Sequence, residues 1–471
     1  MQIDLQPVWI ITRREIRDQF RDWRIVIPIL ALTLIFPAIM NFTAAQAVRF
    51  VERFGAELIG ERLIPFLLMV VGFFPISVSL VIALESFVGE KERRSIEPLL
   101  ASPLNDWHLY LGKLLAVIVP PLLAAYLGIG VYLIGIYRQI GWSPEPTLLV
   151  QILALTTIQA FLMVCGAVVI STQATSVRAA NLLASFIIIP MAFLIQGEAM
   201  VMFWAQYDVL WWVVFGLVVA SVLLLRMGIS HFNREELLGR ELDTLNLRAS
   251  LNLFWSALRG DSSTLPVWYR RQVFPALRRM GQPALFVSIL AVLFVWLGSG
   301  QAQVFPIPPE VLDLNRLEIE TFTRLGEFSL LEAGGIAQVW WHNLRAVMLA
   351  MVLGIVTLGV FGVVVLLLPI MLIGYFLGVF AAAGVDPLRM LAAFILPHGI
   401  LEIPAIVLAG AGLLYLGGRL VAPSNGRTIG EEFVLGMAEW AKVFLGVIAP
   451  MFLGAAILEV FVTPRVVLLL F

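Results

Sequence analysis

Long apolar runs separated by short polar stretches recur along the whole chain of 471 residues. A helix needs roughly 20 apolar residues to cross the hydrocarbon core of a bilayer. In the first half, the runs that approach or reach this length lie at 25–42, 63–84, 114–137, 148–170, 182–195 and 209–225. The pattern predicts six membrane-spanning helices before residue 230. The fifth is interrupted by Pro190 and followed by Gln196, Gly197 and Glu198, so a re-entrant turn is an alternative there.

The second half predicts five further spans. One fits residues 284–297, and the stretch from Arg345 to Gly384 then carries no charge between its ends. At about 1.5 Å of rise per residue that stretch is long enough for two spans, with the reversal at Gly359 and Gly362. The last two spans fit 391–420 and 433–462. The predicted fold class is an all-α polytopic membrane protein with about eleven transmembrane helices.

Two basic amphipathic segments divide this series. Residues 7–23 set Trp9, Ile10 and Phe20 against arginines, a pattern typical of a helix lying flat on the membrane. The alternative is a flank of the first span whose arginines extend to the headgroups. A similar basic stretch at 268–280 introduces the second group of spans. We therefore predict a membrane domain at 1–230, a cytoplasmic linker at 231–265 and a second membrane domain at 266–471.

Composition and charge support this class. Apolar residues make up 60% of the chain and charged residues 13%, far from the balance of a soluble domain. A net charge of −1 gives no reason to expect nucleic-acid binding, and the single Cys165 excludes a disulfide framework within the chain. With the N-terminus in the cytoplasm, nine of the 31 basic residues fall outside: Arg49, Arg53, Arg62, Arg138, Arg316, Arg324, Arg345, Arg389 and Arg465. This bias predicts that orientation, in the inner (cytoplasmic) membrane.

The segment Glu85–Lys113 (ESFVGEKERRSIEPLLASPLNDWHLYLGK) is a charged insert between the second and third spans. Alone, its run of alternating charges is typical of a solvated helix face. Between two spans, however, the apolar residues Ile96, Leu99 and Leu100 suggest an exposed docking surface on the cytoplasmic side.

Three motifs together carry a family resemblance: REIRDQFRDWR at Arg14–Arg24, the Glu85–Lys113 segment, and VRAAN at Val177–Asn181. Residues 1–230 resemble the permease subunits of type-2 ATP-binding-cassette transporters. The resemblance implies an N-terminal elbow helix, six spans, two such bundles per transporter (a homodimer or heterodimer), and a coupling helix at Ser86–Leu104 that docks on a separate ATPase. The implied coupling residues are Glu85, Glu90, Glu92, Arg93, Arg94, Ile96, Glu97, Leu99 and Leu100, and the implied elbow residues are Arg14, Glu15, Arg17, Asp18 and Arg24.

The chain has no phosphate-binding loop of its own. Its one Gly-Lys pair, Gly112–Lys113, is followed by Leu and lacks a preceding glycine at the required spacing. We therefore expect no cofactor on this chain, with ATP and Mg²⁺ bound by the partner ATPase.

The second half carries another motif, FILPHGILEIPAIVLAGAGLL at Phe394–Leu414, together with WWHNLRAV at Trp340–Val347. With these motifs, residues 265–471 resemble the stage II sporulation protein M family, which implies a membrane fold more than a defined activity. His398 and Glu402 share one helix face inside or at the edge of the membrane, and Glu459 is a plausible third member from the last span. Such a pair could bind a metal or relay protons. Two ligands on one turn do not make a metal site, however, and a structural pair is the alternative; we expect no metal.

These observations favour a permease subunit of an ATP-driven exporter. Two other functions are weighed against it: a membrane scaffold that organises cell-envelope or wall-remodelling proteins, and an intramembrane hydrolase using His398 and Glu402. The hydrolase is least favoured, because no nucleophile is evident. Few ionisable residues lie in the spans, which favours a lipid, glycan or other amphiphile as cargo over a small ion.

Overall fold

A computed structural model describes residues 4–54, 57–92, 102–174, 176–232, 247–307, 333–422 and 427–470. Its contacts divide the chain into two compact units, residues 1–245 and 246–471. Each unit is built from helices, and the described residues contain no strand. Eleven helices in the described ranges are long and apolar enough to cross a membrane, six in the first unit and five in the second. The predicted all-α class and the number of spans are therefore confirmed.

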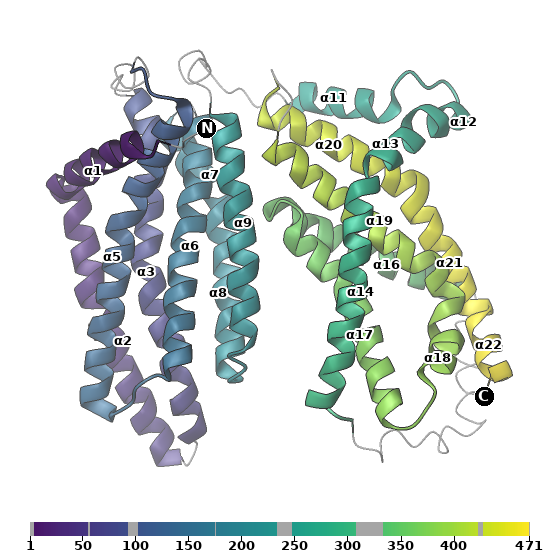
Figure 1. Cartoon of the computed structure of the whole chain (residues 1–471), viewed down its shortest axis with the longest axis horizontal. Helices are drawn as coiled ribbons and strands as arrows, with labels where there is room; N and C mark the ends of the chain where they lie inside the picture. Colours follow the sequence, from purple (N-terminus) through teal and green to yellow (C-terminus); the bar gives the residue numbers. More distant parts are fainter. Residues whose placement is uncertain are drawn as a thin grey trace. The chain divides into compact units, whose positions relative to one another are not determined.

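The first unit is a bundle of long helices with a shorter N-terminal helix across one end (Figure 1). Its elements are α1 (Gln6–Arg21), α2 (Trp23–Phe54), α3 (Glu57–Glu92), α5 (Asp106–Ile140), α6 (Pro146–Gln173), α7 (Val177–Leu183), α8 (Ser185–Phe203) and α9 (Val209–His231). The helices α3, α5 and α6 pack on one another and enclose two cores, which include Phe87 and Tyr110 at one end and Tyr132 at the other.

The fifth span differs from one of its two predicted forms. The helix α8 continues through Gln196, Gly197 and Glu198 to Phe203, so the chain does not turn at these polar residues. Glu198 is buried and accepts hydrogen bonds from Gln159 Nε2 at 2.9 and 2.8 Å. Because Gln159 of α6 donates hydrogen bonds to this carboxyl group, Glu198 is accommodated within the continuous helix α8. The alternative prediction of a re-entrant turn at this point was wrong.

The second unit begins with short helices and continues with five long ones. Its elements are α11 (Leu247–Arg259), α12 (Leu265–Trp268), η1 (Tyr269–Val273), α13 (Phe274–Arg279), α14 (Gly281–Val304), α16 (Ala333–Val356), α17 (Val360–Ala382), α18 (Pro387–Met390), η4 (Leu391–Ile395), α19 (Leu396–Val421), α20 (Ile429–Val443), η5 (Phe444–Ile448), α21 (Ala449–Phe461) and α22 (Thr463–Leu470). The helix α11 packs on α20, so residues from 247 onwards belong to this unit.

Glycines fix two features of the second unit. Gly359 has a φ of 94°, a conformation that side chains disfavour, and it joins α16 to α17 at the predicted reversal. Along the α14–α17 pair, a Cβ on Gly298 would overlap the Met371 carbonyl and one on Gly374 would overlap the Val295 carbonyl. Small residues allow these two backbones to touch, which is a common way for helices to associate in membranes.

Candidate coupling site

Both ends of the predicted coupling segment are visible, whereas residues 93–101 lie outside the described residues. The helix α3 ends at Glu92, and α5 begins at Asp106. Arg93, Arg94, Ile96, Glu97, Leu99 and Leu100 fall in the gap, so their places in the site stay a prediction.

Lys113 joins the two helices that flank the segment. Its Nζ lies 2.6 Å from Glu90 Oε1 on α3 and 3.6 Å from Glu15 Oε1 on α1, and 5.3 Å from the centre of the Phe87 ring. The lysine side chain is 2% exposed, whereas the two carboxylates are 29% and 20% exposed. An ammonium group buried this deeply needs such partners. The ammonium group of Lys113 therefore connects three helices, α1, α3 and α5.

The elbow helix α1 rests directly on the start of α5. The Thr12 hydroxyl lies 2.8 Å from the Val8 carbonyl oxygen and 3.1 Å from that of Gly112. A Cβ at Gly112 would come within 2.7 Å of Ile11, so only glycine fits this approach without a shift. In contrast, Trp9 and Ile10 are exposed, as expected of a face turned to lipid.

A histidine adds a second link between the N-terminus and α5. Asn105 N donates a hydrogen bond to His108 Nδ1 at 3.2 Å. Because Nδ1 accepts, the ring proton is on Nε2, which donates to the Asp4 carbonyl oxygen at 3.1 Å. The residues just before and after the start of α5 are thus attached to the segment that leads into α1.

On the other side, Glu92 holds the start of α7. Its Oε1 accepts a hydrogen bond from Val177 N at 2.8 Å. Ser176 caps the same helix by accepting from Ala179 N at 3.2 Å. A carboxylate at a helix N-terminus is favourable because the first backbone N–H groups have no partner in the helix. The VRAAN motif therefore begins against the last residue of α3.

A serine from α6 inserts its hydroxyl between backbone groups of α3. Ser171 Oγ accepts from Phe87 N and Val88 N, each at 3.1 Å, and donates to the Leu84 carbonyl oxygen at 2.7 Å. One buried side chain thus fixes the backbone of α3 on either side of Glu85. Together these contacts connect the flanks of the coupling segment to α1, α6 and α7.

The structure brings Glu15, Glu90 and Glu92 of the predicted set into this arrangement. The other elbow residues are peripheral: Arg14 and Asp18 form an exposed ion pair at 3.9 Å, and Arg17 is exposed. Glu85 lies in α3 and Arg24 in α2, but their side chains are outside the described residues, so an ion pair between them stays a prediction.

Sequence reasoning did not assign roles to Lys113, His108 and Ser171. Lys113 could have been recognised from the sequence, because a lysine that lies next to a long apolar run needs an acidic partner. Ser171 had none, since a serine inside an apolar run is ordinarily a neutral packing residue.

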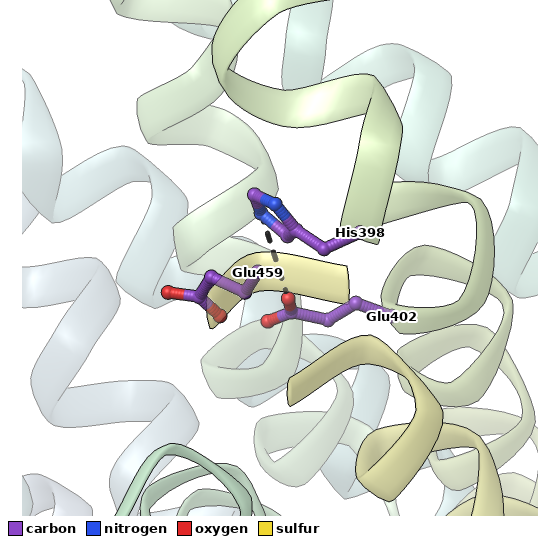
Figure 2. Close-up of side chains that lie close together, drawn as sticks. All are labelled: His398, Glu402 and Glu459. Atoms are coloured by element: carbon purple, nitrogen blue, oxygen red, sulfur yellow. Dashed lines mark ion pairs between the residues drawn. The ribbon is translucent and has the colours of Figure 1, made fainter. Parts of the chain in front are cut away.

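The second predicted site lies in the other unit. His398 and Glu402 occupy the first turns of α19, and Glu459 approaches them from α21 (Figure 2). His398 Nε2 is 3.9 Å from Glu402 Oε2, and one ligand atom from each of the three residues lies within 4.8 Å of the others. The grouping of these three residues is therefore present.

Comparison with known proteins found two family models that match the chain. Residues 284–464 match Stage II sporulation protein M, and residues 51–299 match the ABC-2 family transporter protein. The two matches overlap within α14. No curated protein matches the chain. The transporter model spans more than half of the 471 residues, from α2 through α14. The chain is a multi-pass membrane protein that belongs to the ABC-2 transporter family and also carries a region that matches Stage II sporulation protein M.

Proposed function

We propose that a separate ATPase docks on the Ser86–Leu104 segment of this permease and drives export across the inner membrane, with the N-terminus in the cytoplasm. Membership of the ABC-2 family makes the chain a membrane subunit of an ABC transporter. Such a subunit is not itself the ATPase. The family implies an ATPase partner in general. In the proposal, ATP and Mg²⁺ bind to that partner. Two copies of this chain, or this chain and a related one, form the transport path.

The observation that carries this proposal is the attachment of both flanks of the segment. Glu90 and Lys113 link α3 to α5, Glu15 adds α1, and Glu92 reaches α7. A force applied to residues 93–104 would therefore reach four helices at once rather than bend one loop. This is what a lever between a nucleotide-driven subunit and a membrane bundle requires. Movement of these helices would then alternate access to the path from the two sides.

The experiment is affinity purification of the full chain from native membranes in a mild detergent, followed by measurement of ATP hydrolysis. We expect a co-purifying ATPase, and we expect the hydrolysis to be lost when Ile96→Asp and Leu99→Asp are introduced together. The matched control is Leu251→Asp, at an exposed apolar position of α11 in the second unit. A chain that transports without any ATP-hydrolysing partner would contradict the proposal.

A second candidate function rests on the match of residues 284–464 to Stage II sporulation protein M. In that case the chain is a membrane scaffold for cell-envelope or wall-remodelling proteins, and transport is not its role. Changes at Ile96 and Leu100 would then leave function intact. Replacement of the acidic residues between 305 and 332 would abolish it, and this opposite pattern separates the two candidates.

A further inference from the structure

Three ligand-bearing side chains converge at one end of the second unit. His398 and Glu402 lie one helical turn apart on α19, and Glu459 comes from the last turn of α21. All three are half-buried, and Figure 2 shows them grouped between the two helices. Glu402 and Glu459 are more than fifty residues apart in the chain, so this grouping is a property of the fold.

A threonine determines which nitrogen of His398 faces the carboxylates. His398 Nδ1 lies 3.1 Å from Thr463 Oγ1, and that hydroxyl lies 3.3 Å from the Leu458 carbonyl oxygen. Since the hydroxyl proton goes to the carbonyl, Oγ1 accepts and Nδ1 carries the ring proton. The lone pair of Nε2 is then directed away from Thr463, on the side of Glu402. Histidines that bind metals are held in this way by a hydrogen bond from the other nitrogen.

In the described part of the chain, the ion-pair partner of Glu402 is a histidine rather than a lysine or arginine. Within the described part of the chain, no lysine or arginine lies within ion-pair distance of Glu402 or Glu459. Two acidic groups and an imidazole set close together in an apolar helix bundle need a proton or a cation among them. A divalent ion would supply two positive charges at this point.

We propose that His398, Glu402 and Glu459 bind one divalent transition-metal ion of the Zn²⁺ or Mn²⁺ type. Imidazole nitrogen and carboxylate oxygen are suitable ligands for both ions. Ligand atoms on one such ion, at bonds of about 2.0–2.2 Å, lie roughly 3.3 Å apart. The three present atoms lie within 4.8 Å of one another, so side-chain rotations that shorten these distances by up to about 1.5 Å would reach that spacing.

Three protein ligands leave at least one coordination position for water, whereas a structural metal site has all its positions filled by protein ligands. The site is thus open as well as half-buried. The third ligand from a second helix removes the reason for expecting no metal, because the ligand set is no longer confined to one turn of α19.

The test uses the full chain, purified in detergent, stripped with a chelator and then incubated with ZnCl₂ or MnCl₂ alone. Elemental analysis after gel filtration should give about one ion per chain for at least one of the two metals, by the proposal's count of one site. Glu402→Gln and Glu459→Gln, which keep the side-chain shape, should each remove the bound ion. The exposed His342 of α16 provides the matched control, and His342→Ala should keep it.

Thr463→Val gives a finer readout. Loss of the hydrogen bond to Nδ1 should weaken metal binding by about 10- to 100-fold and leave the stoichiometry at saturation unchanged. Added metal should also raise the melting temperature of the wild-type chain and leave that of Glu459→Gln unchanged. A wild-type chain that binds neither ion above the level of the double variant Glu402→Gln/Glu459→Gln overturns the proposal.

Discussion

Lys113 Nζ on α5 lies 2.6 Å from Glu90 Oε1 on α3, so one partly buried ion pair joins the two helices that flank the predicted coupling segment. Glu15 of α1 completes the group at 3.6 Å. The elbow helix is thus part of the same electrostatic arrangement, and a displacement of either flank changes its contacts.

The loss of stability on removing one partner of this pair should depend on which partner is removed. Glu90→Gln removes the carboxylate that lies nearest to a buried ammonium, and we expect a loss of about 3 kcal/mol of stability. Lys113→Met keeps the apolar stem and leaves two partly exposed carboxylates, so we expect about 1–2 kcal/mol. Thermal unfolding in detergent should rank the two variants in this order. A double variant that is no more stable than Glu90→Gln alone would contradict the pairing.

Ser171→Ala should weaken the connection between α6 and α3. The change removes an acceptor from Phe87 N and Val88 N and a donor from the Leu84 carbonyl, at a cost of about 1–3 kcal/mol. The control is Ser288→Ala, because the hydrogen bond that Ser288 makes among the described residues stays within its own helix, to the Ala284 carbonyl. Melting temperatures measure the difference. Equal effects of the two changes would show that the Ser171 contacts do not stabilise α3.

The buried pair of Gln159 and Glu198 leads to an asymmetric prediction. Gln159→Leu leaves the Glu198 carboxyl group without its donor in an enclosed site, and we expect a loss of about 1–3 kcal/mol. Glu198→Gln keeps a carbonyl acceptor in place, and its effect should be smaller than about 1 kcal/mol. Chemical or thermal unfolding would measure both. A larger effect from Glu198→Gln than from Gln159→Leu would contradict this account of α8.

Close packing of α14 on α17 should make Gly374 intolerant of a side chain. Gly374→Ala places a Cβ against the Val295 carbonyl, and separation of the helices should cost about 1–3 kcal/mol. Gly300→Ala is the matched control, since a Cβ there meets nothing within 4 Å. A melting temperature for Gly374→Ala equal to that of the control would contradict the packing.

The eleven spans and the turn at Gly359 could be predicted from sequence, because span length and charge are local properties. The three motifs of the first half also pointed to the elements that meet around Lys113. The partners of Ser171 and Glu198 could not be predicted in the same way. Each depends on which face of one helix meets another far along the chain, and apolar runs carry little periodicity to fix that face.

The threonine beside His398 illustrates the limit. Sequence reasoning named Glu459 as a plausible neighbour of Glu402, but it gave no reason to choose Thr463. That residue follows the end of α21, where the chain changes direction. Only the three-dimensional arrangement places its hydroxyl beside the imidazole.

Site-specific labelling and crosslinking at Leu99 tests the central claim most directly. Leu99→Cys is suited to this because the single natural cysteine, Cys165, is buried and the unmodified chain serves as the control. We predict that a membrane-impermeant maleimide reaches Cys at position 99 only from the cytoplasmic side, and that a short crosslinker joins it to a co-purifying ATPase. Labelling from the outside of the cell, or no crosslink to any ATP-hydrolysing protein, would contradict the account.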